Sequence, residues 1–236
     1  MIHYVRLPLE GTSNTRDLGG YATKDGHSTK WHVFLRSDDL FDLTQKDKVF
    51  LEDYGLKTVI DLRSTTEQAL RPSPYEQDLK VDFYNVSLFE NANPKVMVTL
   101  PLDILKSMYI EMLLEHQEEI KAVLTLMANA KEGLILFNCA AGKDRTGVIA
   151  MLLLGLAKVP NRDIVSNYEV SFTNLKRSMF FSQRKDNISH LMYSTNDYME
   201  ETLRYLKAHY GNTEDYLISI GLTKEILQKL KDRFVI

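Results

Sequence analysis

Short apolar runs alternate with segments of helical periodicity over much of the chain. Each run has the length and composition of a buried β-strand. These runs are residues 33–36, 57–62, 81–86 and Leu134–Asn138. A further strand or hairpin is expected around residues 4–7 and 20–22. Strands that alternate with helices predict an α/β fold with a mostly parallel central sheet flanked by helices.

Capping residues mark where helices begin. Thr44 followed by Asp47 predicts one start, and that helix is expected to stop at Gly55. Ser64 with Glu67 predicts a second start of the same kind. These boundaries place a helix between each pair of predicted strands.

Two longer stretches are predominantly helical. Residues 94–130 are expected to form a helical insertion, a lid or pocket wall, with two helices that meet near Glu115 and His116. Residues 160–236 form a helical carboxy-terminal part. Its predicted N-terminal caps are Ser194 or Thr195, then Asn212 and Thr223.

Length and composition predict one soluble domain over residues 1–236. The chain is 44% hydrophobic and 26% charged, and no low-complexity linker divides it. Residues 148–157, the longest apolar run, are too short to cross a bilayer and predict a core helix. Without an evident signal peptide a cytoplasmic location is expected, with export by a non-classical route left open. The net charge of −3 argues against nucleic acid as a partner.

The only cysteine of the chain, Cys139, lies in a turn between a predicted strand and a predicted helix. The first turn of a helix offers unpaired N–H groups and a positive dipole end to an anion. A cysteine placed there should ionise easily to a nucleophilic thiolate. Arg145, with its planar fork, could return across the turn and bind two phosphate oxygens.

The remaining positions of the turn fit the binding of a phosphate. Ala140, Ala141 and Gly142 would let the backbone approach the anion closely, and Gly147 ends the motif. The Thr146 hydroxyl could donate a hydrogen bond to the thiolate. Together these positions predict a loop that binds a tetrahedral dianion.

Two other interpretations of the turn compete with the binding of a phosphate. A nucleotide-binding Walker A loop fails on spacing, because Asp144 follows Gly142 and Lys143 where Ser or Thr would be needed. In the second interpretation Cys139 is a buried, inert core residue, as free cysteines usually are. The coincidence of Cys, Arg, Thr and two Gly residues favours phosphatase chemistry.

The string Cys-x-x-Gly-Lys-Asp-Arg-Thr-Gly, residues 139–147, resembles the phosphate-binding loop of the atypical, lipid-active bacterial tyrosine phosphatases. Its Asp-Arg-Thr ending is similar to that of the myotubularin lipid phosphatases. Further similar blocks are residues 14–21, 35–37 and 60–63. The resemblance implies a tyrosine-phosphatase-like fold, a phosphocysteine intermediate and no cofactor or metal. The chain departs from the pattern at Asn138, where many relatives have His. The amide can still form local hydrogen bonds and order the loop, but it cannot carry a positive charge, so modest attenuation of activity is expected.

The general acid is expected to be an aspartate. The only tryptophan, Trp31, is followed by His32 and therefore not by the Pro-Asp of the usual acid loop. Asp144 is preferred by resemblance to the myotubularins, and Asp61, at the end of a predicted parallel strand, is the second candidate. Either could instead be structural. Asp144 would then pair with Lys143 or fix the loop, and Asp61 would pair with Arg63 or Arg16.

The resemblance also implies supporting residues. Arg16, Asp17 and Arg36 are expected to buttress the loop through ion pairs, with a simple scaffold role as the alternative. Lys143 is expected to reach a second phosphate or an inositol ring, unless it is only solvated. The six histidines lack metal-ligand spacing and none is assigned to a metal.

Phosphotyrosine proteins are the leading substrate class. Phosphoserine or phosphothreonine proteins and phosphoinositides are further substrates to consider, with a phosphoinositide-specific phosphatase as the alternative enzyme. A catalytically weak, phosphate-binding regulatory module is the alternative from another class. The basic segment at residues 176–185 could rest on an anionic membrane surface, although a solvated helix is favoured.

Overall fold

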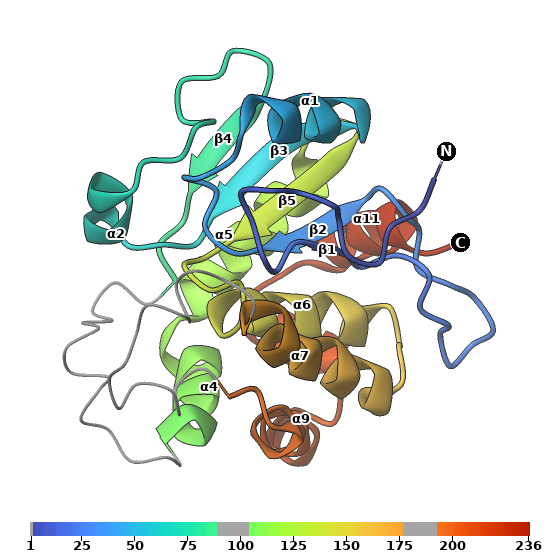
Figure 1. Ribbon diagram of the computed structural model, residues 1–236. Coiled ribbons are helices and arrows are strands. Elements are labelled where there is room, and N and C mark those ends of the chain that lie inside the picture. Colours follow the sequence, from blue (N-terminus) through green and yellow to red (C-terminus); the bar gives the residue numbers. More distant parts are fainter. Residues whose placement is uncertain (1, 89–103, 177–192) are drawn as a thin grey trace.

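A computed structural model describes residues 2–88, 104–176 and 193–236 of the chain (Figure 1). Its centre is a five-stranded sheet with the strand order β1-β2-β5-β3-β4. All neighbouring strands are parallel except β1, which runs antiparallel to β2. The strands are β1 (Arg16–Asp17), β2 (Phe34–Ser37), β3 (Leu56–Asp61), β4 (Asp82–Asn85) and β5 (Leu134–Asn138). The predicted α/β fold with a mostly parallel sheet is therefore confirmed.

Helices cover both faces of the sheet (Figure 1). They are α1 (Gln45–Asp53), α2 (Thr65–Leu70), α4 (Ile104–Glu115), α5 (Gln117–Asn129), α6 (Arg145–Leu156), α7 (Asn161–Leu175), α9 (Asn196–Tyr210), α10 (Thr213–Ser219) and α11 (Lys224–Phe234). Successive side chains of the central strands enter two different cores, because strand side chains alternate between faces. Leu134 and Leu136 pack on the side of α1, whereas Ile135 and Phe137 join the larger core on the side of α5, α6 and α11.

The predicted helix boundaries are confirmed at the caps. Thr44 with Asp47 and Ser64 with Glu67 both form complete capping boxes at the starts of α1 and α2. Gly55 has a φ of +101° directly after α1, a conformation that glycine adopts without strain. In the helical insertion α4 and α5 meet at His116. Thr195, Asn212 and Thr223 are the N-terminal caps of α9, α10 and α11.

The amino-terminal region differs from the expectation. Residues 4–7 and 20–22 contribute only isolated bridges, one between Arg6 and Arg16 and one between Ala22 and Ser28. The regular strand of this region is instead β1, in which Arg16 lies opposite Arg36. A strand of two charged residues has no apolar pattern, so its pairing depends on tertiary contacts that local sequence does not reveal.

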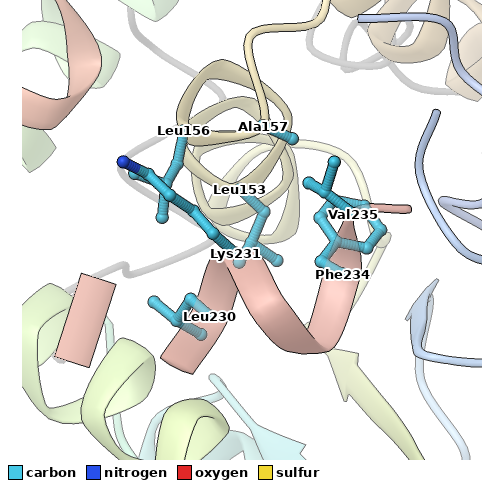
Figure 2. A pocket seen from close by; sticks show the side chains of 7 residues that line it. All are labelled: Leu153, Leu156, Ala157, Leu230, Lys231, Phe234 and Val235. Atoms are coloured by element: carbon cyan, nitrogen blue, oxygen red, sulfur yellow. The ribbon is translucent and has the colours of Figure 1, made fainter. Parts of the chain in front are cut away.

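The predicted core helix is α6, most of whose residues are buried. At its carboxyl end a small apolar hollow lies against α11, too tight to admit a water molecule (Figure 2). It is lined by Leu153, Leu156, Ala157, Leu230, Lys231, Phe234 and Val235. Because the opposite end of α6 carries the cysteine loop, this hollow is a seam between packed helices and lies apart from that loop.

Two sequence expectations fall partly outside the described residues. These are the beginning of the helical insertion, up to residue 103, and residues 177–185 of the basic segment. Across the three described ranges, no helix combines the length and apolar character needed to cross a membrane.

Candidate active site

The cysteine loop connects the carboxyl end of β5 to the start of α6. β5 lies between β2 and β3, so the loop is at the carboxyl edge of the parallel strands, where α/β folds bind ligands. Cys139 is buried, whereas Ala140 is exposed and Ala141 is half-buried. The loop thus has an open side directly next to the cysteine.

Gly142 allows the loop to pack against the end of β2. Its φ is +63°, and a Cβ at this position would lie 2.5 Å from the backbone of Ser37 and Asp38. Both the conformation and the close approach therefore require glycine. This small residue was expected because an anion would approach the loop closely. The contact with the end of β2 is a second reason for glycine here.

The carbonyl groups of the loop are held from the amino-terminal region. Asn14 Nδ2 donates to the carbonyls of Ala141 and Gly142 at 3.0 and 3.1 Å. Arg36 Nη2 donates to the carbonyls of Gly142 and Lys143 at 2.8 and 3.3 Å. The C=O and N–H groups of one peptide unit point in opposite directions, so the N–H groups of residues 142–144 point away from Asn14 and Arg36. Asn14 is the first residue of the amino-terminal block, residues 14–21, which resembles the family, but its role was not predicted.

Arg36 contacts the loop, and Arg16 contacts Asn14 and α7, through hydrogen bonds to neutral groups where ion pairs were expected. Arg36 Nη1 donates to Asn167 Oδ1 at 2.6 Å, and Arg16 Nη2 donates to the Asn167 carbonyl and to Ser171 Oγ at 3.0 and 3.1 Å. Neither guanidinium has an ion pair with a carboxylate in the described part of the chain. Burial lowers the pKa of Arg36 to about 10, although the neighbouring Cys139 charge opposes this shift. Arg36 therefore remains a cation at neutral pH.

Asp17 belongs to a different part of the amino-terminal block. Its carboxylate accepts hydrogen bonds from the backbone N–H groups of Gly19 and His32 at 2.8 and 3.0 Å. The Tyr54 hydroxyl donates to it at 3.0 Å. Burial raises the pKa of Asp17 and these hydrogen bonds oppose the shift. The contacts of Asp17 are therefore with Gly19, His32 and Tyr54, and the expected ion pair to the loop is not formed.

Arg145 is held by an acidic residue that sequence reasoning assigned only to a helix cap. Its Nη1 and Nη2 donate to the two carboxylate oxygens of Glu67 at 2.6 and 2.8 Å. Glu67 also accepts from the Ser64 backbone in the capping box of α2. Burial alone would lower the pKa of Arg145, but Glu67 and the Cys139 charge raise it overall. This pair fixes the guanidinium beside the cysteine and leaves its other N–H groups for an anion.

Asp144 lies directly before α6 and is partly open to solvent. Its side chain is 22% exposed, and the Tyr109 hydroxyl donates to its Oδ1. Lys143 Nζ lies 3.3 Å from the same oxygen and donates to the Tyr193 carbonyl at 2.9 Å. Lys143 is therefore buried and paired, neither solvated nor free to reach a ligand in this conformation.

Asp61 is placed as a structural partner. It is fully buried, and Arg63 donates to its carboxylate from the backbone N–H, from Nε and from Nη2, the last at 2.6 Å. Arg63 also pairs with Asp39 at 3.2 Å. A carboxylate saturated by such donors has no oxygen directed at the open side of the loop, so the structure favours the Arg63 partnership over the acid role for Asp61.

Two expected hydrogen bonds are not formed. Thr146 Oγ1 and both polar atoms of the Asn138 side chain are buried without a hydrogen-bond partner among the described residues. Thr146 therefore does not donate to the cysteine here, and Asn138 does not order the loop through its side chain. Gly147 faces Arg36 and Tyr168, and a Cβ there would lie 3.4 Å from the Tyr168 ring.

Comparison with known proteins assigns the family. The family model described as "Tyrosine phosphatase family" matches residues 7–236. The chain belongs to this tyrosine phosphatase family. A tyrosine-protein phosphatase from Nostoc commune is 35% identical over 217 residues, which cover 85% of this chain and 74% of that protein. A putative tyrosine-protein phosphatase from Cupriavidus necator is 25% identical over 228 residues, with coverages of 89% and 82%.

Solved structures were compared as well. P. aeruginosa TpbA, solved in complex with phosphotyrosine, has a TM-score of 0.43 and 13% identity to this phosphatase. The match covers 81% of this chain and 87% of TpbA. The family assignment therefore depends on the sequence matches alone.

Proposed function

We propose that this protein hydrolyses phosphotyrosine in proteins, with Cys139 as the nucleophile. The observation that carries the proposal is the loop itself, whose carbonyls are turned inward by Asn14 and Arg36 while Cys139 lies at its base. The thiolate attacks phosphorus, a phosphorus–sulfur bond forms and the bond from phosphorus to the tyrosine oxygen breaks. Water then attacks the phosphocysteine, releases inorganic phosphate and regenerates the thiolate.

The charge around the loop supports the binding of a dianion. Arg36 and Arg145 both lie close enough to Cys139 for its charge to favour their charged forms, although burial still lowers the pKa of Arg36 overall. Burial and the neighbouring Arg36 lower the pKa of Arg16. A bound phosphate would offset this concentration of positive charge, so preorganised cations and amides stabilise the transition state without a metal. We infer that activity persists in EDTA and needs no cofactor.

Asp144 is the proposed general acid. Both partners of its carboxyl group in the described residues, Tyr109 and Lys143, are on Oδ1. Oδ2 can therefore carry the proton that passes to the leaving oxygen, and can later accept a proton from the attacking water. Arg63 engages the competing carboxylate, Asp61, on both oxygens.

Among substrates, phosphotyrosine is favoured over phosphoinositides. The relatives from Nostoc commune and Cupriavidus necator are both named tyrosine-protein phosphatases. Lys143, the residue expected to reach an inositol ring, is buried against Asp144 and the Tyr193 carbonyl. A lipid substrate would require this lysine to leave both partners.

The test is release of inorganic phosphate in EDTA from phosphotyrosine and phosphoserine peptides and from monophosphorylated phosphoinositides. Wild type is compared with Cys139→Ser. Turnover that depends on Cys139 and is fastest for phosphotyrosine is expected. Faster turnover of phosphoinositides would reassign the substrate class. No turnover, with phosphate analogues still bound, would favour a regulatory module.

A further inference from the structure

Two buried tyrosines connect the cysteine loop to α4 and α7. Tyr109 of α4 and Tyr168 of α7 are 0% and 1% exposed, and their hydroxyl oxygens lie 2.6 Å apart. The Tyr109 hydroxyl also donates to Asp144 Oδ1. A chain of hydrogen bonds therefore runs from Tyr168 through Tyr109 to the carboxyl group at the start of α6.

The proton positions in this chain follow from the chemistry of its end. Tyr109 has one hydroxyl proton, and its bond to Asp144 uses that proton. Tyr168 must then donate to the Tyr109 oxygen. Burial, and next the Asp144 charge, raise the pKa of Tyr109 well above its ordinary value, so the hydroxyl stays protonated under ordinary assay conditions.

This arrangement serves Asp144 in both of its protonation states. Oδ1 accepts the Tyr109 hydrogen bond when the carboxyl group is ionised, and it still accepts the bond when Oδ2 carries a proton. The hydrogen bond therefore fixes the orientation of the carboxyl group without opposing the transfer of its proton. Lys143, 3.3 Å from Oδ1, contacts the same oxygen.

The hydroxyl groups are not needed for packing. Both rings lie in the large apolar core, where phenylalanine would fill nearly the same space. A buried hydroxyl without a partner is costly, so tyrosine is favoured here by the polar partner that it finds. That partner, at the end of the hydrogen-bond chain, is the Asp144 carboxyl group in the cysteine loop.

We propose that Tyr109 and Tyr168 are positioning residues that hold Asp144 Oδ1, so that Oδ2 presents the proton to the leaving group. This inference depends on the proposed function, in which Asp144 is the general acid. The tyrosines do not contact the substrate and act only through Asp144.

The test compares Tyr109→Phe and Tyr168→Phe with a matched control, Tyr216→Phe. Tyr216 is also fully buried, and its hydroxyl donates to the Leu113 carbonyl at 2.8 Å. Each variant is assayed on phenyl phosphate, a poor leaving group, and on p-nitrophenyl phosphate, an activated one. Thermal unfolding is recorded in parallel.

We expect Tyr109→Phe to lower kcat on phenyl phosphate about tenfold and on p-nitrophenyl phosphate about twofold. This difference between the two substrates, the leaving-group split, arises because phenolate must receive a proton as its bond to phosphorus breaks, whereas p-nitrophenolate can leave without one. Tyr168→Phe should give the same split with a smaller magnitude, since it leaves the bond to Asp144 in place. Tyr216→Phe should change kcat on both substrates by the same factor. In an Asp144→Asn background, Tyr109→Phe should produce no further split.

Several results would overturn the inference and locate the failure. Equal losses on both substrates for Tyr109→Phe and Tyr168→Phe, as for Tyr216→Phe, would leave the tyrosines a packing role only. If Asp144→Asn itself gave no split while turnover still required Cys139, the positioning role would fall and the phosphatase function would stand. Turnover that survived Cys139→Ser would refute the proposed function itself.

Discussion

Asp144 and Asp61 occupy the same carboxyl edge of the sheet but have opposite surroundings. Asp61 is fully buried, and Arg63 supplies donors to both of its carboxylate oxygens. Asp144 is 22% exposed and is contacted on Oδ1 alone by described residues. A carboxyl group can transfer a proton only if one oxygen is accessible, so the comparison separates a carboxylate with structural partners on both oxygens from the proposed general acid. The partners decide the role, because the residue type and the position at a strand end are shared.

The largest effect is expected from Asp144→Asn. Loss of a general acid typically costs about 10²–10⁴-fold, and the loss should appear on phenyl phosphate far more than on an activated aryl phosphate. The free energy of unfolding should fall less than for a fully buried ion pair, because the asparagine can still accept the Tyr109 hydrogen bond and Lys143 keeps its bond to the Tyr193 carbonyl. Steady-state kinetics on both substrates, with urea unfolding as the control, checks this expectation. Equal losses on the two substrates would assign Asp144 a structural role.

Asp61→Asn should reverse that pattern. Removal of one partner from a buried ion pair costs about 3–5 kcal/mol, and the lower end is expected because Asp39 remains 3.2 Å from Arg63. Urea unfolding should detect the loss of stability. Any loss of activity should be the same for both leaving groups. A loss confined to phenyl phosphate would restore Asp61 as the acid and break the comparison.

Glu67→Gln tests a third carboxylate at the same edge. The amide can accept from only one of the two Arg145 Nη groups, so we expect a loss of about 1–3 kcal/mol in transition-state stabilisation. The loss should be visible in kcat/KM and independent of the leaving group, since Arg145 binds the phosphate in the proposed mechanism. The exposed pair Lys80 and Glu52 offers a matched control, because Glu52→Gln should leave kcat/KM unchanged. An unchanged kcat/KM for Glu67→Gln would show that Arg145 needs no such partner.

The smallest effect concerns Asp38, a fourth carboxylate, which accepts from the Ser13 and Asn14 backbone. Burial raises its pKa from 3.8 to about 6, although these hydrogen bonds oppose the shift. Between these values the folded state holds a proton that the unfolded state has lost. The free energy of unfolding should therefore fall by about 1 kcal/mol as the pH rises from about 5 to about 7.

Asp38→Asn should remove this slope, and urea unfolding at several pH values measures it. Burial also raises the pKa of Asp17, which adds a slope of the same sign, so the difference between wild type and variant is the quantity to use. The Glu67 contribution is lost only in more acidic solution, because Arg145 holds its pKa below 4.5. Identical slopes for the two proteins would contradict an ionisable, buried Asp38.

Local sequence was sufficient for the central parallel strands, for several helix starts and for the loop, but not for β1. Apolar runs and capping residues predicted β3, β5 and the starts of α1 and α2, since periodicity and caps depend on neighbours along the chain. The motif likewise placed Cys139 and Arg145 in one turn between β5 and α6.

The partners within the site could not be predicted in this way. Asn14 reaches the loop across 127 residues, Glu67 reaches Arg145 across 78, and Tyr109 lies 35 residues from Asp144. Such contacts are set by how distant elements pack, and no local pattern encodes them. The same reason explains why the ion pairs expected for Arg16 and Arg36 proved to be hydrogen bonds to neutral groups.

In the proposed mechanism the phosphoryl group passes through Cys139. The most direct measurement is an acid quench of the reaction with a phosphotyrosine peptide, followed by mass spectrometry of the peptide that contains Cys139. We expect this peptide to carry one phosphoryl group during turnover of the wild type and none in Cys139→Ser. The variant should also release no phosphate. Sustained phosphate release by Cys139→Ser, or turnover in which the phosphoryl group resides on another residue, would contradict it.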